Sequence, residues 1–355
     1  MERTRFYQKR TLVLFVLLCT VIWPVQANHY WKDANVYFDG FSTGIIRDIE
    51  YAEDGLWLGA ENGLFRLAGE EAERFELPYL TSGYISDLEL TVEGDIWLTV
   101  YGTGIFLKRR DGAIEKLEQG EAFQSAWQVH DTGSTLLVLT VGSVLIYDKR
   151  SSEIVRKIDG LTKRKFDGFP YIFSNKEHTL IIEGSDVLHA QDSSFKFDEY
   201  EIEKYWPRLS TVSHIAHHRN VYHVVGPEGV YSGSKLFEPE IYRSADRPLK
   251  NIKLVTSIDD TVTLVGNSLS KLTKTKVEAV RWVRNLWDDQ EIGTITSATE
   301  SEDGDIYIAS SQKGLIYIPT FFDAITTSEQ NSGLLTRALG RIVDGNSISS
   351  TKIYR

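Results

Sequence analysis

The residues in this sequence most able to do chemistry are four histidines that fall close together. They are His214, His217, His218 and His223. With 217–220 as a hairpin loop, Ala216 pairs with Val221, and His214 faces His223 across two strands. Two imidazoles placed in this way could hold zinc or copper, but no third ligand is evident. We therefore expect an ordinary polar cross-strand pair here, and no metal site.

Other catalytic and metal-binding patterns are missing from the sequence. Acidic residues stand before glycine at Asp54, Glu93 and Asp303, but without the run of oxygen ligands that calcium needs. Hairpin turns explain these pairs better. The sequence contains no G-x-S-x-G elbow, P-loop, dinucleotide-binding fingerprint or H-E-x-x-H motif. Acidic residues are scattered, so no catalytic carboxylate pair stands out. We expect no catalytic residue, no metal and no cofactor, and a protein that is not an enzyme.

Aromatic and basic residues in loops are the better candidates for ligand binding. Such residues stack on sugar rings or peptide side chains, and arginine adds a directional donor. The ligand-binding candidates are Tyr84, Trp127, Tyr171, Trp206, Arg208 and Trp287. Trp127 and Tyr171 also begin predicted strands, so packing between sheets is an equal alternative for these two. The Pro-Arg pair after Trp206 argues for a loop residue at that position.

These candidates are organised by a repeated unit. The stretch Ile46–Leu67 has an aspartate before alternating apolar residues, an acidic-glycine turn, a Leu-Trp-Leu strand and a Gly-Leu-Phe return. It recurs as Ile85–Leu107 and Ile295–Ile318. Trp57 and Trp97 occupy the same position one repeat apart. A period near 40 residues with short strands and glycine turns is typical of a propeller blade.

Four weaker units with the same period lie between these three, so the chain holds seven in all. We predict an all-β fold, a seven-bladed β-propeller of four-stranded antiparallel blades, with six or eight blades as the alternative counts. The seventh unit shows three strands, and 35–39 could supply the missing outer strand. The ring would then be closed by an N-terminal strand, which removes exposed sheet edges.

One position recurs near the start of each predicted inner strand. It is occupied by Asp48, Asp87, Gln128, Ile172, His214, Lys253 and Ser297. Because inner strands surround the central channel of a propeller, this pattern predicts a ring of mostly polar side chains near that channel. We interpret it as structural hydrogen bonding in preference to ligand contact.

The first residues have the features of an export signal. Basic residues precede an apolar stretch of about 13 residues and a Val-Gln-Ala end, typical of a signal peptide cut after Ala27. Cleavage removes the only cysteine and takes the net charge from −11 to −14, because four basic residues and one acidic residue leave. A chain without disulfides suits the bacterial periplasm. Its negative charge argues against nucleic acid or an anionic membrane as partner.

The predicted organisation is therefore 1–27 as signal peptide, 28–320 as propeller and 321–355 as linker or tail. The last segment could also begin a further module, with the membrane reached through that module or through an uncleaved signal.

The best units resemble the two-component regulator propeller repeat, whose pattern is I-x-D-I, then D-G-x-(I/L)-W-(I/L)-G, then G-L-x-R. The first unit matches at Asp48, Ile49, Asp54, Gly55, Leu56, Trp57, Leu58, Gly59, Gly63, Leu64 and Arg66. The second matches at Asp87, Gly94, Ile96, Trp97, Leu98, Gly104 and Ile105, and the last at Asp303, Gly304, Ile306, Tyr307, Gly314 and Leu315. The middle units match only in period and apolar pattern.

The resemblance implies the periplasmic sensor region of a histidine kinase or diguanylate cyclase type of signalling protein. We expect a non-catalytic periplasmic propeller that senses or binds a small ligand, such as an oligosaccharide, or a periplasmic protein. A free-standing protein-interaction scaffold is the second hypothesis, and a propeller lyase or hydrolase the third. The resemblance does not name the ligand.

Overall fold

The computed structural model describes residues 37–38, 41–68, 71–77, 84–159, 171–175, 177–191, 195–258, 261–267, 269–279, 293–312 and 314–318. The predicted signal peptide (1–27), the predicted tail (321–355) and Trp287 lie outside these residues. Among the described residues, no helix is both long and apolar enough to cross a membrane.

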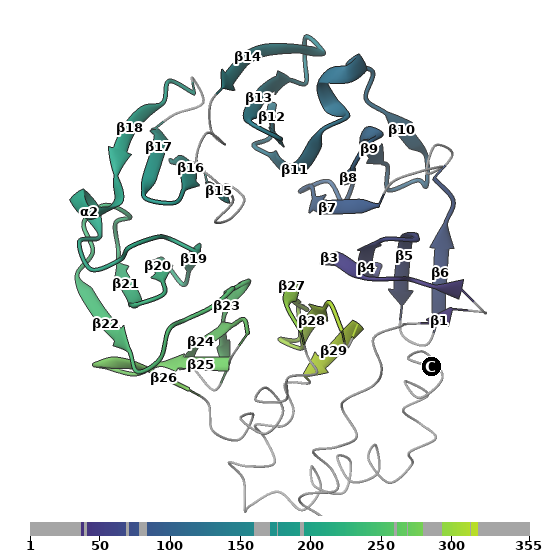
Figure 1. Cartoon of the computed structure of the whole chain (residues 1–355). Helices are drawn as coiled ribbons and strands as arrows, with labels where there is room; N and C mark the ends of the chain where they lie inside the picture. Colours follow the sequence, from purple (N-terminus) through teal and green to yellow (C-terminus); the bar gives the residue numbers. More distant parts are fainter. Residues whose placement is uncertain are drawn as a thin grey trace, which may run out of the picture.

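The described chain is an all-β propeller, in which sheets are arranged around a central axis (Figure 1). Four sheets are four-stranded antiparallel meanders in chain order. The first holds β3 (Ile46–Ala52), β4 (Gly55–Ala60), β5 (Gly63–Ala68) and β6 (Glu71–Phe75). The second holds β7 (Ile85–Leu90), β8 (Ile96–Val100), β9 (Gly104–Lys108) and β10 (Ile114–Lys116), followed by the 3-10 helix η1 (Gly120–Phe123).

The third sheet holds β11 (Ala126–Asp131), β12 (Thr135–Thr140), β13 (Ser143–Asp148) and β14 (Glu153–Asp159). The fourth holds β15 (Tyr171–Ser174), β16 (Thr179–Glu183), β17 (Asp186–Ala190) and β18 (Asp198–Glu201), followed by α2 (Ile202–Tyr205). In each sheet the first strand lies nearest the axis and the fourth lies outermost (Figure 1).

The next two meanders form one eight-stranded sheet. The first contains β19 (His214–His218), β20 (Val221–Gly226), β21 (Gly229–Gly233) and β22 (Ile241–Ala245). The second contains β23 (Leu254–Ile258), β24 (Thr261–Val265), β25 (Leu269–Leu272) and β26 (Lys276–Ala279). Their outer strands β22 and β26 pair through Ser244 with Lys276 and Ala245 with Val277. The pairing is parallel because outer strands of neighbouring meanders run in the same direction.

The last sheet has three described strands, β27 (Ile295–Glu300), β28 (Ile306–Ser310) and β29 (Gly314–Ile318). The prediction of seven separate four-stranded sheets therefore needs correction. The repeated meander is present, but two meanders share one sheet, and the last shows no fourth strand among the described residues.

The predicted closure by an N-terminal strand is wrong for the described chain. β1 (Tyr37–Phe38) pairs with β2 (Phe41–Ser42) and does not join β29, because the short segment folds back on itself as a ribbon. The first and last sheets meet through their inner strands instead. Thr296 Oγ1 donates a 2.7 Å hydrogen bond to the Ile46 carbonyl, and Ala309 and Leu315 pack with residues of the first sheet.

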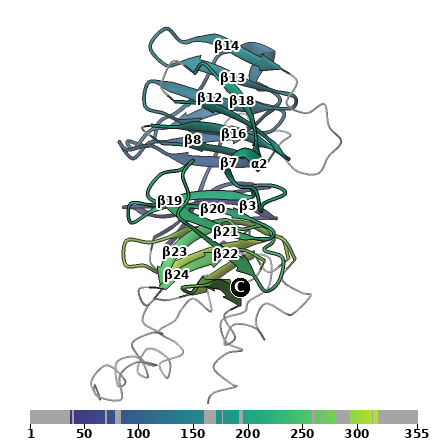
Figure 2. The same cartoon turned by 90° about the vertical axis from the view of Figure 1, so that its left-hand side faces the viewer.

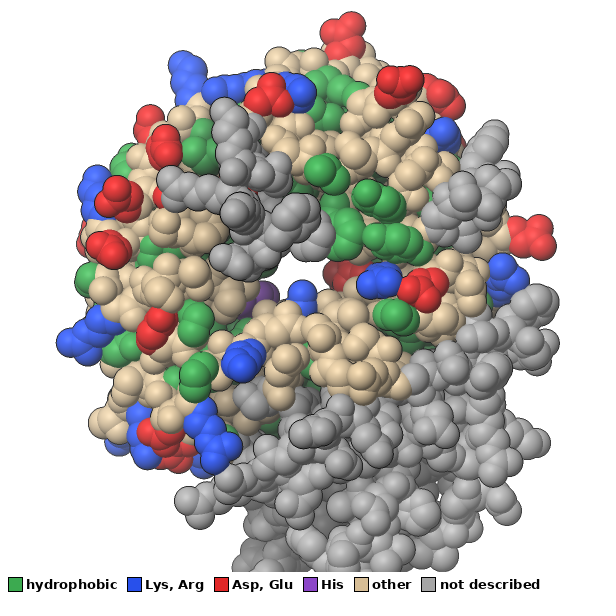
Figure 3. Space-filling view, viewed as in Figure 1, with side chains coloured by type: hydrophobic (Ala, Val, Ile, Leu, Met, Phe, Trp, Pro, Cys, Tyr) green, Lys and Arg blue, Asp and Glu red, His purple; other side chains and the backbone are tan. Residues whose placement is uncertain are grey.

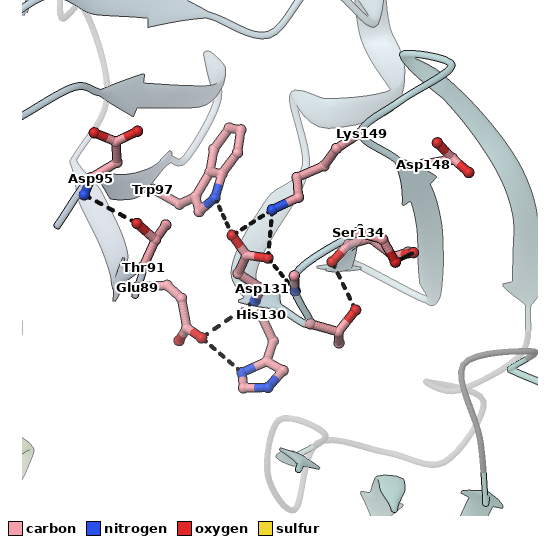
Figure 4. Close-up of polar contacts among 12 residues, drawn as sticks. Glu89, Thr91, Asp95, Trp97, His130, Asp131, Ser134, Asp148 and Lys149 are labelled. Atoms are coloured by element: carbon pink, nitrogen blue, oxygen red, sulfur yellow. Dashed lines mark hydrogen bonds and ion pairs between the residues drawn. The ribbon is translucent and has the colours of Figure 1, made fainter. Parts of the chain in front are cut away.

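The core lies between neighbouring sheets, and the predicted tryptophan positions are buried there. Trp57 is 1% exposed and Trp97 is 4% exposed. Each indole N–H reaches a carboxylate: Trp57 Nε1 donates to Asp54 Oδ1 at 2.8 Å, and Trp97 Nε1 donates to Asp131 Oδ2 at 2.9 Å. Because Asp131 belongs to the third sheet and Trp97 to the second, this bond joins two sheets. Figure 4 shows Lys149 directed at the same carboxylate.

Candidate ligand site at the channel mouth

The inner strands of the first, second, third and last sheets share one irregularity near their first residues. In β3, β7, β11 and β27 one extra residue interrupts the pairing with the second strand. The extra residues are Arg47, Ser86, Trp127 and Thr296. A β-bulge redirects a side chain away from the ladder. We term the side of the ring where these inner strands begin the mouth face.

Three aromatic side chains meet on the mouth face of the second and third sheets. Tyr84, just before β7, stacks on Tyr101, just after β8, with ring centroids 5.5 Å apart and planes at 19°. Trp127, the bulge residue of β11, stands edge-on to Tyr84 at 6.4 Å and to Tyr101 at 6.1 Å. Tyr101 is 38% exposed. We call Tyr84, Tyr101 and Trp127 the aromatic ledge.

A charged pair borders the aromatic ledge. The Arg47 guanidinium carbon lies 4.9 Å from the Tyr84 ring centroid, close enough for a cation–π contact. Arg47 NH2 also forms a 2.7 Å ion pair with Glu61 Oε1, and both side chains are about one-third exposed. Figure 3 shows hydrophobic side chains gathered over β7, β8 and β11, beside a basic and an acidic group over the first sheet. The ledge therefore offers flat apolar rings next to hydrogen-bonding groups.

Side-chain carboxylates connect neighbouring inner strands along the channel. Asp48 in β3 accepts a 2.7 Å bond from the backbone N–H of Leu88 in β7. Asp87 in β7 likewise accepts a 2.9 Å bond from Val129 N in β11. Glu89 accepts from Asp131 N and from His130, as Figure 4 shows. The expected structural hydrogen bonding of Asp48 and Asp87 is present, because each uses the free backbone edge of the next inner strand.

The same carboxylates form an acidic wall. Burial raises the pKa of Asp48, and it raises the pKa of Asp87 well above its usual value, with further increases from neighbouring carboxylates, Asp48 foremost. The pKa of Glu50 is also raised well above its usual value, by burial first and then by Asp48 and Glu89. Several carboxyl groups therefore share a poorly solvated space, which favours their neutral, protonated forms.

Cationic and imidazole groups face this wall. Burial lowers the pKa of Lys253, and the charges of Asp48 and Asp87 partly offset that effect. Burial also lowers the pKa of His214 to about 4, with Lys253 as a second cause. Lys253 thus interacts with residues of β3, β7 and β19, which places all of them around one channel. Figure 3 shows a central opening with acidic, basic and histidine side chains beside it.

This convergence corrects the interpretation of the acidic residues as scattered. Asp48 and Asp87 are one repeat apart, and so are Glu50 and Glu89. Equivalent positions of successive repeats lie on neighbouring blades, so the repeat alignment carried the signal. The sequence prediction compared the repeats only at the position of Asp48 and Asp87. It therefore missed that Glu50 and Glu89 also occupy equivalent positions.

The structure separates the six predicted ligand candidates. It brings Tyr84 and Trp127 together on the ledge, with Tyr101, which the sequence reasoning missed. Tyr171 instead connects two meanders: its hydroxyl donates to the Ile215 carbonyl at 3.0 Å and accepts from Ile215 N at 3.3 Å. Burial raises the pKa of Tyr171 to about 12. For Tyr171, the packing alternative describes the observed contacts.

Trp206 and Arg208 lie away from the mouth. Trp206 is 0% exposed, and its Nε1 donates to the Leu236 carbonyl at 3.3 Å. The expectation of an open loop residue is wrong, because α2 directs the indole into the core, where it stacks on Phe237 with centroids 5.7 Å apart. Arg208 is exposed, and its guanidinium lies 4.9 Å from the ring centroid of Tyr242 in outer strand β22. Trp287 is outside the described residues.

The histidine hairpin has a different register from the predicted one. Arg219 and Asn220 form a two-residue turn, with φ of 50° and 61°. His214 therefore pairs with Val225, and His223 pairs with Ala216. Two positive-φ residues make the tight turn that matches strand twist, and asparagine tolerates this conformation, so the longer predicted loop is wrong. Among the described residues, no group of three or more metal-ligating side chains could hold an ion.

Comparison with known proteins supports the fold. No family model and no curated protein matches the chain. Among solved structures, the extracellular domain of a putative hybrid two-component system from B. thetaiotaomicron is similar over 84% of this chain, with TM-score 0.63 and 16% identity. This chain spans 42% of that protein's length. Other extracellular domains of one-component and hybrid two-component systems from this organism are also similar.

Propellers of other kinds share the architecture. A streptogramin B lyase has a TM-score of 0.61 and 13% identity, covering 81% of this chain and 96% of its own. YCF48 bound to a D1 peptide has a TM-score of 0.57 and 12% identity, covering 82% of this chain and 97% of its own. Such low identities establish the propeller fold and leave the activity to be argued from the site.

Proposed function

We propose that this protein is a non-catalytic periplasmic propeller that binds a small ligand at the channel mouth, as the sensor part of a two-component or diguanylate cyclase type of signalling system. The aromatic ledge beside the Arg47–Glu61 pair carries the proposal. In this view the ring consists of seven repeat units of the two-component regulator type, and the eight-stranded sheet counts as two. The sequence repeats and the similar fold of extracellular domains from putative one-component and hybrid two-component systems support this assignment.

The chemistry of the ledge favours a ligand with sugar rings. A partly exposed tyrosine stack offers a flat apolar surface, and Trp127 stands across its edge. Pyranose rings present apolar C–H faces to such surfaces while their hydroxyls need donors and acceptors. Arg47 supplies donors and Glu61 supplies acceptors next to the rings. An oligosaccharide is therefore the proposed ligand class.

The hydrogen bonds between inner strands give binding a physical route to a signal. Arg47 and Asp48 are adjacent in β3, and Asp48 holds the backbone of β7. A ligand that moves the Arg47–Glu61 pair would therefore act on β3, which is hydrogen-bonded to β7. If the ligand binds one arrangement of the inner strands more tightly, it raises the population of that arrangement. A module that packs against the propeller would then shift between its own conformations.

The test is a binding screen with defined oligosaccharides, peptides and purified envelope proteins. Calorimetry with the wild-type protein should identify an oligosaccharide, and Tyr101→Ala should lower its affinity about 10-fold or more, as for a central aromatic contact. Arg47→Met should also weaken binding. Ile241→Ala is the matched control, because Ile241 is 43% exposed on outer strand β22.

Two other outcomes would favour the alternatives. Binding of an envelope protein without any small ligand would favour the interaction scaffold. The lyase or hydrolase alternative is favoured by the converging channel carboxylates and by the lyase of similar fold. Mass spectrometry of the same panel after incubation tests it: products that disappear in Glu50→Gln would overturn the non-catalytic assignment.

A further inference from the structure

Three polar side chains on one face of the β19–β22 meander form a chain of hydrogen bonds. Arg243 NH1 lies 3.1 Å from Ser232 Oγ, which lies 3.0 Å from His223 Nδ1. A guanidinium can only donate, so Ser232 Oγ is the acceptor in the first bond. The Ser232 hydroxyl keeps its own proton and can donate it to His223 Nδ1. In that arrangement the neutral imidazole of His223 carries its proton on Nε2.

In that arrangement the Nε2–H group of His223 is an unsatisfied donor. The residue is 4% exposed, and within the described part of the chain Nε2 has no hydrogen-bond partner. A buried donor without an acceptor loses its hydrogen bond to water without replacement, so native structures rarely retain one. We therefore expect an acceptor next to His223 Nε2 that is not among the described protein atoms.

The Arg243 guanidinium, a permanent cation, is linked to His223 through Ser232. Arg243 donates through Nε to the Thr273 carbonyl at 2.6 Å, and no described carboxylate forms an ion pair with it. Burial lowers the pKa of Arg243 and lowers that of His223 to about 4, where the nearby charges of His218, Arg243 and His217 contribute further. His218 Nε2 lies 2.7 Å from Ser257 Oγ of β23. An acceptor in this place would therefore gain most if it were negative.

The cluster is open at its rim. His218, Arg243 and Ser257 are half-buried, and His218 directly precedes the Arg219–Asn220 turn. This end of β19 is opposite to the mouth face, where the inner strands begin. The cluster lies where the β19–β22 meander meets the β23–β26 meander, since Arg243 and His218 contact Thr273 and Ser257.

We propose that His223, Arg243 and His218 form a binding site for a small oxyanion, phosphate or sulfate in character, between these two meanders. The Nε2–H of His223 and the guanidinium of Arg243 donate to the anion, and Ser232 holds both groups in place. The anion satisfies the buried donor and neutralises the local positive charge. This site is independent of the ligand proposed at the mouth and lies on the opposite face.

Thermal unfolding in sulfate or phosphate, against chloride at equal ionic strength, tests the proposal. At an oxyanion concentration about five times Kd, linkage predicts a Tm increase of about 2–4 °C for a chain of this size. Arg243→Met and His223→Asn should abolish the increase. Arg110→Met should retain it, because Arg110 is an exposed arginine paired with Glu53 elsewhere.

A measurement on the wild-type protein avoids dependence on how the variants fold. Imidazole nitrogen NMR should show His223 protonated on Nε2, with that signal shifting as sulfate is added. An equal Tm increase in all variants, or an unshifted His223 signal, would overturn the proposal.

Discussion

Tyr171 gives the sharpest distinction between a residue that binds ligand and one that supports the ring. Its hydroxyl both donates to and accepts from the backbone of Ile215, on the free edge of inner strand β19. Tyr171→Phe keeps the ring, which lies 5.6 Å from the His214 ring, and removes only the bridge. Both backbone groups of Ile215 then lose a partner. Leaving such groups unsatisfied costs about 1–3 kcal/mol.

A loss of about 2 kcal/mol corresponds to a Tm decrease of about 4–8 °C for a domain of this size. Differential scanning calorimetry and urea unfolding measure it. Tyr242→Phe is the matched control, because the Tyr242 hydroxyl also bonds to a carbonyl, that of Glu228, but in an exposed position. Oligosaccharide affinity should be unchanged in Tyr171→Phe. An unchanged Tm, or lost binding with a normal Tm, would refute the structural role assigned to Tyr171.

Two further predictions concern the core and the channel. Trp57→Ala should lower the free energy of unfolding by about 3–5 kcal/mol, because a fully buried indole and its bond to Asp54 are removed, whereas Trp57→Phe should cost less; chemical denaturation of both variants is the check. Asp87→Asn should stabilise the protein more at pH 8 than at pH 5, as measured by thermal unfolding at both pH values. The raised pKa of Asp87 means that its contribution to stability is lost as pH rises through the folded-state pKa, and asparagine removes this loss. A pH-independent effect of Asp87→Asn would contradict the raised pKa assigned to Asp87.

The sequence was sufficient to predict the propeller because its signals are local and repeated. The alternation around Trp57 and the acidic-glycine turns specify strands and hairpins within a few residues. Gly55, at φ 129°, would place a Cβ 2.2 Å from the Leu67 carbonyl oxygen, so glycine is required at that turn. The period then places equivalent residues on neighbouring sheets.

The remaining differences arise from interactions between distant segments. Whether Trp206 faces solvent depends on α2 and on Phe237, which joins the same cluster from beyond β21. The pairing of β22 with β26 depends on the approach of two outer strands, which no local pattern encodes. Tyr101 contacts Trp127, 26 positions later in the chain, because the bulge at Trp127 redirects that side chain toward it.

The central claim is that ligand is bound at the mouth by the aromatic ledge. A crystal structure of the protein with the tightest oligosaccharide from the binding screen tests it most directly. We predict a sugar ring against Tyr84 and Tyr101, near the edge of Trp127, with hydroxyls bonded to Arg47 or Glu61. A ligand bound beside Glu50 and Asp87 in the channel, or on the opposite face of the ring, would contradict the claim.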